Sequence, residues 1–151
     1  MSKKINLEIL AKFAEAVNTG KFDLFKETVS GDNVDHDPAR GQSAGPEGYR
    51  TFFSGLRDAF PDLTVALEKL VADEESVAIA YTLSGTHNGP LMGFAPTGRR
   101  MKIRGVQISK FKDGKMIERW GSSDELGMLQ QLGLFFHSMS SRTDRAGAPT
   151  Q

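Results

Sequence analysis

The N-terminal part of the chain places apolar residues at a helical period. The first group recurs at the spacing i, i+3, i+4, i+7 and consists of Leu10, Phe13, Ala14 and Val17. Asn18-Thr19-Gly20 then predicts the end of this amphipathic helix, because glycine favours the residue after a helix C-terminus. A shorter apolar group in residues 22–29 predicts a second helix ending near Gly31.

The clearest helical pattern lies between two prolines. Pro46 suits a first helical turn, and Pro61 predicts the end of the helix. The apolar face between them carries Tyr49, Phe52, Phe53, Leu56 and Phe60. Residues 34–38 before it predict a short extended segment, which Pro38 stops.

From Leu63 the period changes to two, which is typical of strands. The alternation predicts strands at 63–67, 77–83, 101–111 and 116–120. Asp113-Gly114 between the last two is a strong hairpin signal, and a closing helix follows Asp124. Helices followed by antiparallel strands indicate the α+β class.

Residues 89–98 form a loop with an unusual apolar content, including Leu91, Met92 and Phe94. Loops are normally polar, so these side chains must be covered or must cover something. They either pack on the sheet or in a subunit contact, or they form the lid of a pocket.

Composition narrows the function classes. A chain of 151 residues fits one domain, and its 19 basic and 19 acidic residues cancel without a basic run that could follow nucleic acid or an anionic membrane. The absence of cysteine excludes disulfides and thiolate chemistry. The first residues lack the apolar core of a signal peptide, so we expect a cytoplasmic protein, and we expect the polar segment 138–151 to be disordered.

Strand parity connects residues that are distant in sequence. Gln107 shares a strand face with Ser109, and Trp120 shares a face of the next strand with Asp124 if no bulge intervenes. We therefore expect Gln107, Trp120 and Asp124 to face one cavity, with an apolar wall suited to a flat, oxygenated small molecule.

Asp124 also has a structural interpretation. Ser122 and Glu125 have capping-box spacing, so Asp124 stands where a negative charge stabilises the start of the closing helix. The local pattern alone does not separate this role from catalysis.

The sequence predicts no metal site. His36 lies between Asp35 and Asp37, but neighbouring residues of an extended segment point to opposite faces, so one ion cannot easily collect all three. His36 is either a hydrogen-bond partner in the pocket or an ion-paired surface residue.

Several segments together resemble the SnoaL-like polyketide cyclase family. They are Val34–Pro38, Gly45–Phe53, Ala59–Leu63, the loop at 89–98, Asp113–Lys115 and Trp120–Gly133, and they occur in unbroken order over residues 5 to 135. The resemblance implies a nuclear-transport-factor-2-like fold, a cone-shaped α+β barrel in which N-terminal helices wrap a curved antiparallel sheet. It also implies a single domain over residues 1–137 and a homodimer formed through the sheet. The outer face of that sheet carries either Val77 and Ile79 or Val106 and Ile108.

The resemblance further implies a cofactor-free polyketide or ester cyclase that closes a ring by an intramolecular aldol reaction on a hydrophobic small molecule. By position, Asp124 matches the family's general acid/base, and Gln107 stands where the family has a histidine. Gln107 and His36 are then candidate donors to an enolate. Candidates for the substrate-binding wall are Phe53, Phe60, Tyr81, Met92, Phe94, Trp120 and Met128. The alternatives are an isomerase, a dehydratase or an epoxide hydrolase on this fold, or a non-catalytic binding or interaction module.

Overall fold

The computed structural model describes residues 2–135, so the segment 138–151 lies outside the described residues. In chain order the elements are α1 (Lys3–Thr19), α2 (Leu24–Thr28), β1 (Val29–Asp35), α3 (Pro46–Ala59), β2 (Thr64–Ala72), β3 (Ser76–Thr86), β4 (Arg100–Lys112), β5 (Lys115–Ser123) and α4 (Glu125–Gln131). The α+β class predicted from the sequence is therefore confirmed.

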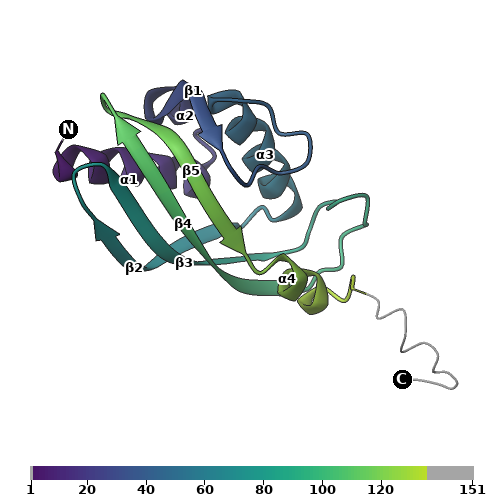
Figure 1. The fold of residues 1–151 in the computed structure, drawn as a ribbon. Helices are drawn as coiled ribbons and strands as arrows, with labels where there is room; N and C mark the ends of the chain where they lie inside the picture. Colours follow the sequence, from purple (N-terminus) through teal and green to yellow (C-terminus); the bar gives the residue numbers. More distant parts are fainter. Residues whose placement is uncertain (1, 136–151) are drawn as a thin grey trace, which may run out of the picture.

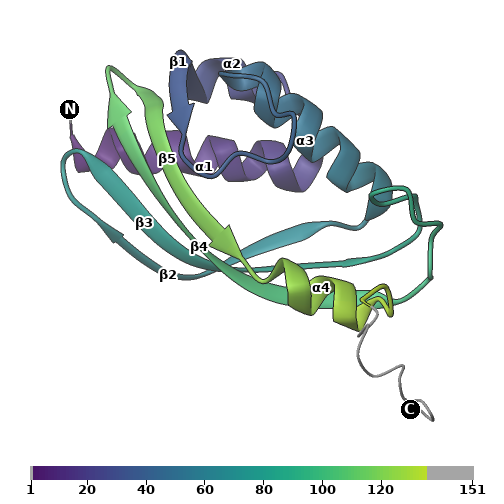
Figure 2. The same ribbon diagram turned by 45° about the vertical axis from the view of Figure 1, so that its right-hand side comes forward.

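The five strands form one curved sheet in the order β1-β5-β4-β3-β2. Strands β2 to β5 are antiparallel neighbours, as predicted, whereas β1 joins the edge parallel to β5. Helices α1 to α3 lie over the concave face of this sheet, and α4 lies at the end of β5 (Figures 1 and 2). This is the cone expected from the resemblance.

The helix boundaries follow from local chemistry. The Ser2 side chain accepts a hydrogen bond from the backbone N–H of Ile5 at 3.2 Å, which caps α1, and Gly20 ends that helix in the left-handed conformation with φ of 80°. Pro46 stands in the first turn of α3, as predicted. The second helix ends at Thr28, earlier than the predicted Gly31, because Val29 already belongs to β1.

The hairpin between β4 and β5 contains one irregularity that changes which residues face the cavity. Asp113 and Gly114 form the predicted turn, with φ of 52° and 77°. Phe111 pairs with Met116, but Lys110 pairs with Glu118, so β5 carries one extra residue at this point. Such a β-bulge reverses the inward and outward alternation of every later residue in the strand.

The core lies between the helices and the concave face of the sheet, and Phe25 and Phe60 are among its fully buried side chains. The convex face carries Val106, Ile108 and Trp120, which are 55%, 45% and 37% exposed. Of the two pairs considered for the outer face, Val106 and Ile108 are therefore correct. Within residues 2–135, every helix is too short or too polar to cross a membrane.

Candidate active site

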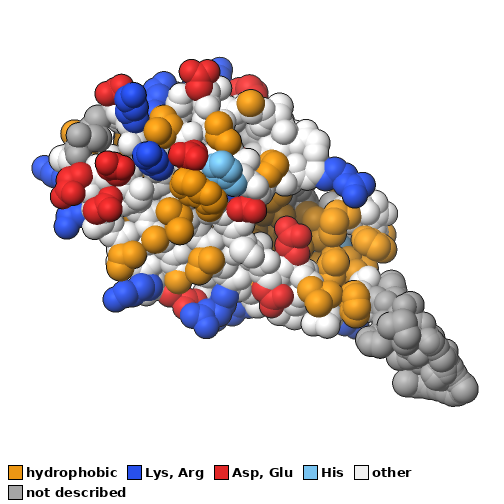
Figure 3. All heavy atoms as spheres, in the orientation of Figure 1, with side chains coloured by type: hydrophobic (Ala, Val, Ile, Leu, Met, Phe, Trp, Pro, Cys, Tyr) orange, Lys and Arg blue, Asp and Glu red, His pale blue; other side chains and the backbone are white. Residues whose placement is uncertain are grey.

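A cavity of about 540 Å³ lies between the helices and the concave face of the sheet. Most of its wall is apolar and comes from α1, α3 and the inner sheet face, including Leu10, Phe13, Val17, Phe52, Phe53, Leu56, Val65, Ile79 and Leu83. The end of β5 and the start of α4 contribute Ser123 and Glu125. The molecular surface is hollowed near α4, and hydrophobic side chains are visible inside the hollow (Figure 3).

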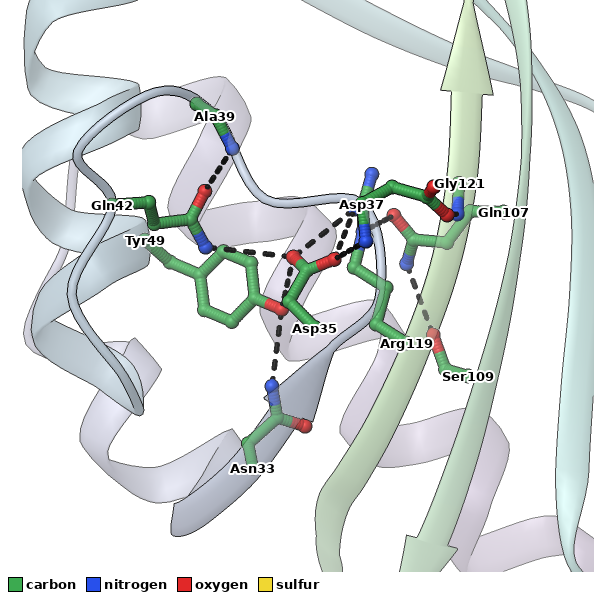
Figure 4. A network of polar contacts seen from close by, with 10 residues as sticks. All are labelled: Asn33, Asp35, Asp37, Ala39, Gln42, Tyr49, Gln107, Ser109, Arg119 and Gly121. Atoms are coloured by element: carbon green, nitrogen blue, oxygen red, sulfur yellow. Dashed lines mark hydrogen bonds and ion pairs between the residues drawn. The ribbon is translucent and has the colours of Figure 1, made fainter.

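An ion pair forms the polar centre of this wall (Figure 4). The Nη1 atom of Arg119 donates to both carboxylate oxygens of Asp35, at 3.0 and 3.1 Å. The side chains are only 18% and 7% exposed, respectively. The two residues are register partners of β5 and β1, so the parallel pairing of these strands brings them together.

Arg119 also contacts the neighbouring strand. Its Nε atom donates to Oε1 of Gln107 at 2.8 Å, and Nε2 of Gln107 donates to Oγ of Ser109 at 3.0 Å. Arg119 thus lies between a carboxylate and an amide. Its planar, permanently charged guanidinium has five N–H donors in fixed directions, which suits such a bridging position.

Asp35 receives further donors from the helix side. The hydroxyl of Tyr49 on α3 donates to Oδ2 of Asp35 at 2.8 Å, and Nδ2 of Asn33 donates to the same hydroxyl at 3.1 Å. Nε2 of Gln42 lies 3.4 Å from Oδ2 of Asp35. Burial, with the negative charge of Asp35, raises the pKa of the Tyr49 phenol well above its ordinary value, so Tyr49 is a neutral donor at physiological pH.

A second aspartate, Asp37, lies just after the end of β1. Oδ2 of Asp37 accepts from the backbone N–H of Gly121 at 2.9 Å, and both residues line the cavity. Asp37 is exposed, and its backbone N–H donates to Oδ1 of Asp35 at 2.9 Å. Besides Glu125 at the start of α4, the cavity wall therefore holds the carboxylates of Asp35 and Asp37, which differ greatly in their numbers of hydrogen-bond donors.

Three of the residues predicted from the sequence line this cavity: Gln107, Phe53 and Tyr81. Gln107 is 7% exposed and faces inward as parity required. Burial raises the pKa of the Tyr81 phenol, which therefore also stays protonated near neutral pH.

The prediction that Trp120 and Asp124 face the cavity with Gln107 is wrong. Gln107 pairs with Gly121, and the bulge in β5 directs Arg119, Gly121 and Ser123 inward, leaving Trp120 on the convex face. Asp124 is exposed and caps α4, its Oδ1 accepting from the N–H of Gly127 at 2.9 Å. This is the structural interpretation of Asp124 considered above.

The remaining predicted residues also lie away from the cavity wall. His36 is the ion-paired surface residue of the two alternatives: its Nε2 lies 2.7 Å from Oε2 of Glu118, and its ring stacks on Trp120 with centroids 4.8 Å apart. Phe60 and Met128 are buried in the core. Met92 and Phe94 are 65% and 39% exposed in the loop before β4, with Phe94 hydrogen-bonded to Leu91 through the backbone.

The residues at the polar centre, Asp35 and Arg119, were not predicted from the sequence. The inward position of Arg119 could not be predicted, because no local sequence pattern indicates the bulge. Tyr49 fits the apolar face of α3, so its polar role could not be predicted either. The spacing of Asp35 and Asp37 does indicate that their carboxylates lie on the same side, because residues two apart in an extended segment share a face. Among residues 2–135, no cluster of three His, Cys, Asp or Glu side chains could hold a metal ion.

The chain is similar in sequence to known polyketide cyclases. The model of a family described as SnoaL-like polyketide cyclase matches residues 8–132. The aklanonic acid methyl ester cyclase DauD of Streptomyces sp. (strain C5) is 29% identical over 134 residues, covering 84% of this chain and 81% of that protein. The nogalonic acid methyl ester cyclase of Streptomyces nogalater is 31% identical over 123 residues, covering 78% and 90%.

The fold is also shared with a solved structure. The crystal structure of IdmH, a putative polyketide cyclase from Streptomyces antibioticus, is 30% identical in sequence and superimposes with a TM-score of 0.74, covering 85% of this chain and 98% of that one.

Proposed function

Because the chain belongs to the SnoaL-like polyketide cyclase family, we propose that it is a cofactor-free cyclase that closes a carbon ring in a hydrophobic, oxygenated small molecule. The observation that carries the proposal is the cavity of about 540 Å³, whose mainly apolar wall contains one largely buried ion pair, Arg119–Asp35. The apolar wall excludes water and folds the substrate so that its ends meet. The ion pair supplies charge where the reaction needs it. We propose a polycyclic ester as substrate, since relatives act on methyl esters of aklanonic and nogalonic acid.

The proton acceptor in this proposal is Asp37. A general base needs a carboxylate oxygen that can come within hydrogen-bond distance of the proton it removes, and oxygens already held by several donors are less available. Asp35 accepts from Arg119, from the Tyr49 hydroxyl and from the Asp37 N–H, with Gln42 close by. The described contacts of the Asp37 carboxylate include a single donor, the Gly121 N–H. Asp37 is therefore the carboxylate that is free to take a proton from a substrate in the cavity, and Asp35 holds Arg119 in place.

Arg119 stabilises the negative charge that forms when the proton leaves. In the proposed reaction, a carbon next to a carbonyl loses its proton to Asp37 and becomes an enolate beside the guanidinium. The enolate carbon attacks a second carbonyl of the same molecule, which forms the ring bond and an alkoxide. The protonated Asp37 returns its proton to the alkoxide, so atoms and charge balance without any co-reactant.

One alternative enzyme class fits the polar centre less well. An epoxide hydrolase of this fold would need two carboxylates on one arginine, in an Asp-Arg-Asp relay. Here Arg119 has Asp35 on one side and the amide of Gln107 on the other. An amide cannot take a proton from an attacking water.

The test compares the same substitution at two aspartates. We expect Asp37→Asn to lower turnover of a β-keto ester or aromatic polyketide mimic by roughly 10²–10⁴, because the amide keeps the shape and the acceptor for Gly121 but cannot act as a base. Asp124→Asn is the matched control and should leave turnover unchanged. A large loss in Asp124→Asn with normal activity in Asp37→Asn would contradict the assignment. Tight ligand binding without turnover in the unsubstituted protein would favour a non-catalytic module.

A further inference from the structure

Two glycines stand on the concave face of the sheet, in the middle of strands where glycine is normally unfavourable. Gly105 of β4 pairs with Tyr81 of β3 and with Ser123 of β5. Gly121 of β5 pairs with Gln107 of β4. The positions 105 and 121 are therefore diagonal neighbours on adjacent strands, which places them roughly 7–8 Å apart.

Gly121 leaves room for the side chain of Arg119. A β-carbon at position 121 would lie 2.7 Å from Cζ of Arg119 and would also overlap Nη2. The guanidinium thus lies across the glycine, which is how Nε reaches Gln107 and Nη1 reaches Asp35. Among residues 2–135, no hydrogen bond from Nη2 to a protein acceptor is formed, so Nη2 is the free end of the guanidinium beside the cavity wall.

Gly105 does the same for Tyr81. A β-carbon at position 105 would lie 2.5 Å from Cζ of Tyr81 and would overlap the hydroxyl oxygen. The phenol therefore lies across Gly105, inside the cavity wall. Burial raises its pKa, against smaller opposite effects of Arg119 and Ser123, so the hydroxyl keeps its proton.

We propose that Nη2 of Arg119 and the hydroxyl of Tyr81 together bind the two oxygens of the substrate's delocalised enolate, with Gly121 and Gly105 as positioning residues that let these side chains lie flat on the sheet. The spacing of the glycines fits two donors that approach a two-oxygen anion from either side. Donors fixed in an apolar cavity stabilise such an anion more than water does, because they need no reorganisation when charge forms. This inference rests on the proposed function for the identity of the anion.

The test uses a stable probe that needs no turnover. The compound 1-phenylbutane-1,3-dione forms an enolate with its own ultraviolet absorbance, so the pKa of the bound diketone can be measured by titration. We expect the protein to increase the enolate fraction of the bound probe about 10- to 100-fold relative to water, a shift of about one to two pKa units. Tyr81→Phe keeps the ring and should lose part of this shift.

The glycine substitutions separate positioning from simple packing. Gly121→Ala and Gly105→Ala should each lose most of the enolate shift, whereas Gly55→Ala on α3, where a β-carbon meets nothing within 4 Å, should retain it. A purely structural role would change stability or probe affinity and leave the enolate fraction of the bound probe unchanged. If Gly121→Ala does not fold, Arg119→Lys keeps a positive charge beside Asp35 but removes Nη2, and it should also lose the shift.

The outcomes also separate this inference from the cyclase proposal. A probe that titrates in the protein as it does in water, that fails to bind, or that is unaffected by Tyr81→Phe and Gly121→Ala would overturn the donor pair. Turnover of a substrate in that situation would leave the cyclase proposal in place. An enolate shift without turnover of any substrate would support the donor pair and count against the cyclase.

Discussion

Asp35 and Arg119 stand 84 residues apart in the chain, yet they are register partners on neighbouring parallel strands and form an ion pair at 3.0 Å. Their side chains are mostly withdrawn from water, and both border the cavity. Each charge therefore needs the other for stability, because a buried charge without an opposite charge beside it destabilises the folded state.

Removing one charge of this pair should destabilise the fold. We expect Asp35→Asn to lower the free energy of unfolding by about 3 kcal/mol, since it leaves the Arg119 guanidinium without its counter-charge. Urea denaturation measures the change. Glu27→Gln is a suitable control, because Glu27 forms a 3.6 Å ion pair with Lys12 in which both side chains are at least half exposed, and such pairs contribute little. Equal losses in the two variants would contradict the buried character of the Asp35–Arg119 pair.

The two tyrosines should titrate abnormally. The chain has only Tyr49 and Tyr81, and burial raises the pKa of both phenols. In the unfolded chain both ionise near the ordinary value of about 10. At pH 10 the folded protein should therefore show less tyrosinate absorbance than the urea-unfolded protein, in which each phenol is about half ionised.

The same shifts give a pH dependence of stability. A raised pKa in the folded state means that the unfolded state loses its protons first as pH rises, so the tyrosine contribution is complete below about pH 10 and declines above it. Tyr49→Phe should flatten this decline in the melting temperature. A tyrosinate signal at pH 10 that is equal in the folded and the urea-unfolded protein would contradict the burial of both phenols.

Asp124 should behave as a helix cap. We expect Asp124→Ala to lower the free energy of unfolding by about 1 kcal/mol, because the N–H of Gly127 loses its acceptor. Asp124→Asn can still accept that hydrogen bond and should lose less. Thermal unfolding of the two variants provides the comparison, and an equal loss in both would argue that charge at the start of α4, rather than the hydrogen bond, is what stabilises the helix.

The convex face of the sheet should form a homodimer interface. Val106, Ile108 and Trp120 are exposed there, and an apolar patch of this kind is favourably covered by a second copy. Light scattering should give about twice the chain mass of 16.5 kDa. Ile108→Glu should produce the monomer, whereas Ile5→Glu, at an exposed apolar residue of α1 away from the convex face, serves as the control. A monomer before any substitution would contradict the interface.

The helices and strands could be predicted from the sequence, whereas the site could not, because the elements depend on local signals and the site depends on how distant strands pair. Helix stops such as Gly20 and the turn at Asp113-Gly114 are local signals, because each depends on the conformational preferences of one or two residues. The inner face of β5 instead depends on one extra residue in the hairpin, and that residue has no distinctive side chain. Strict alternation along β5, without the bulge, therefore predicts that Trp120 and Asp124 face the cavity. In the folded strand Arg119 and Gly121 face it instead.

Gln107 was placed correctly because β4 pairs with β3 in an unbroken register. Tyr49 was assigned to the helix face correctly, but its hydroxyl reaches Asp35, a contact between elements that local periodicity does not encode. The parallel pairing of β1 with β5 was likewise invisible, since it joins the first strand to the last.

The pairing of β1 with β5 also determines the order in which the elements can fold during synthesis. Of the strands in residues 2–135, only β5 pairs with β1, so β1 has no sheet neighbour until almost the whole chain has left the ribosome. Helices α1 and α2 and the β2–β3 hairpin can form earlier, since their contacts are local. The ion pair and the cavity around it are then assembled at the end of synthesis, and a chain truncated before β5 would contain most of the core residues and none of the completed polar centre.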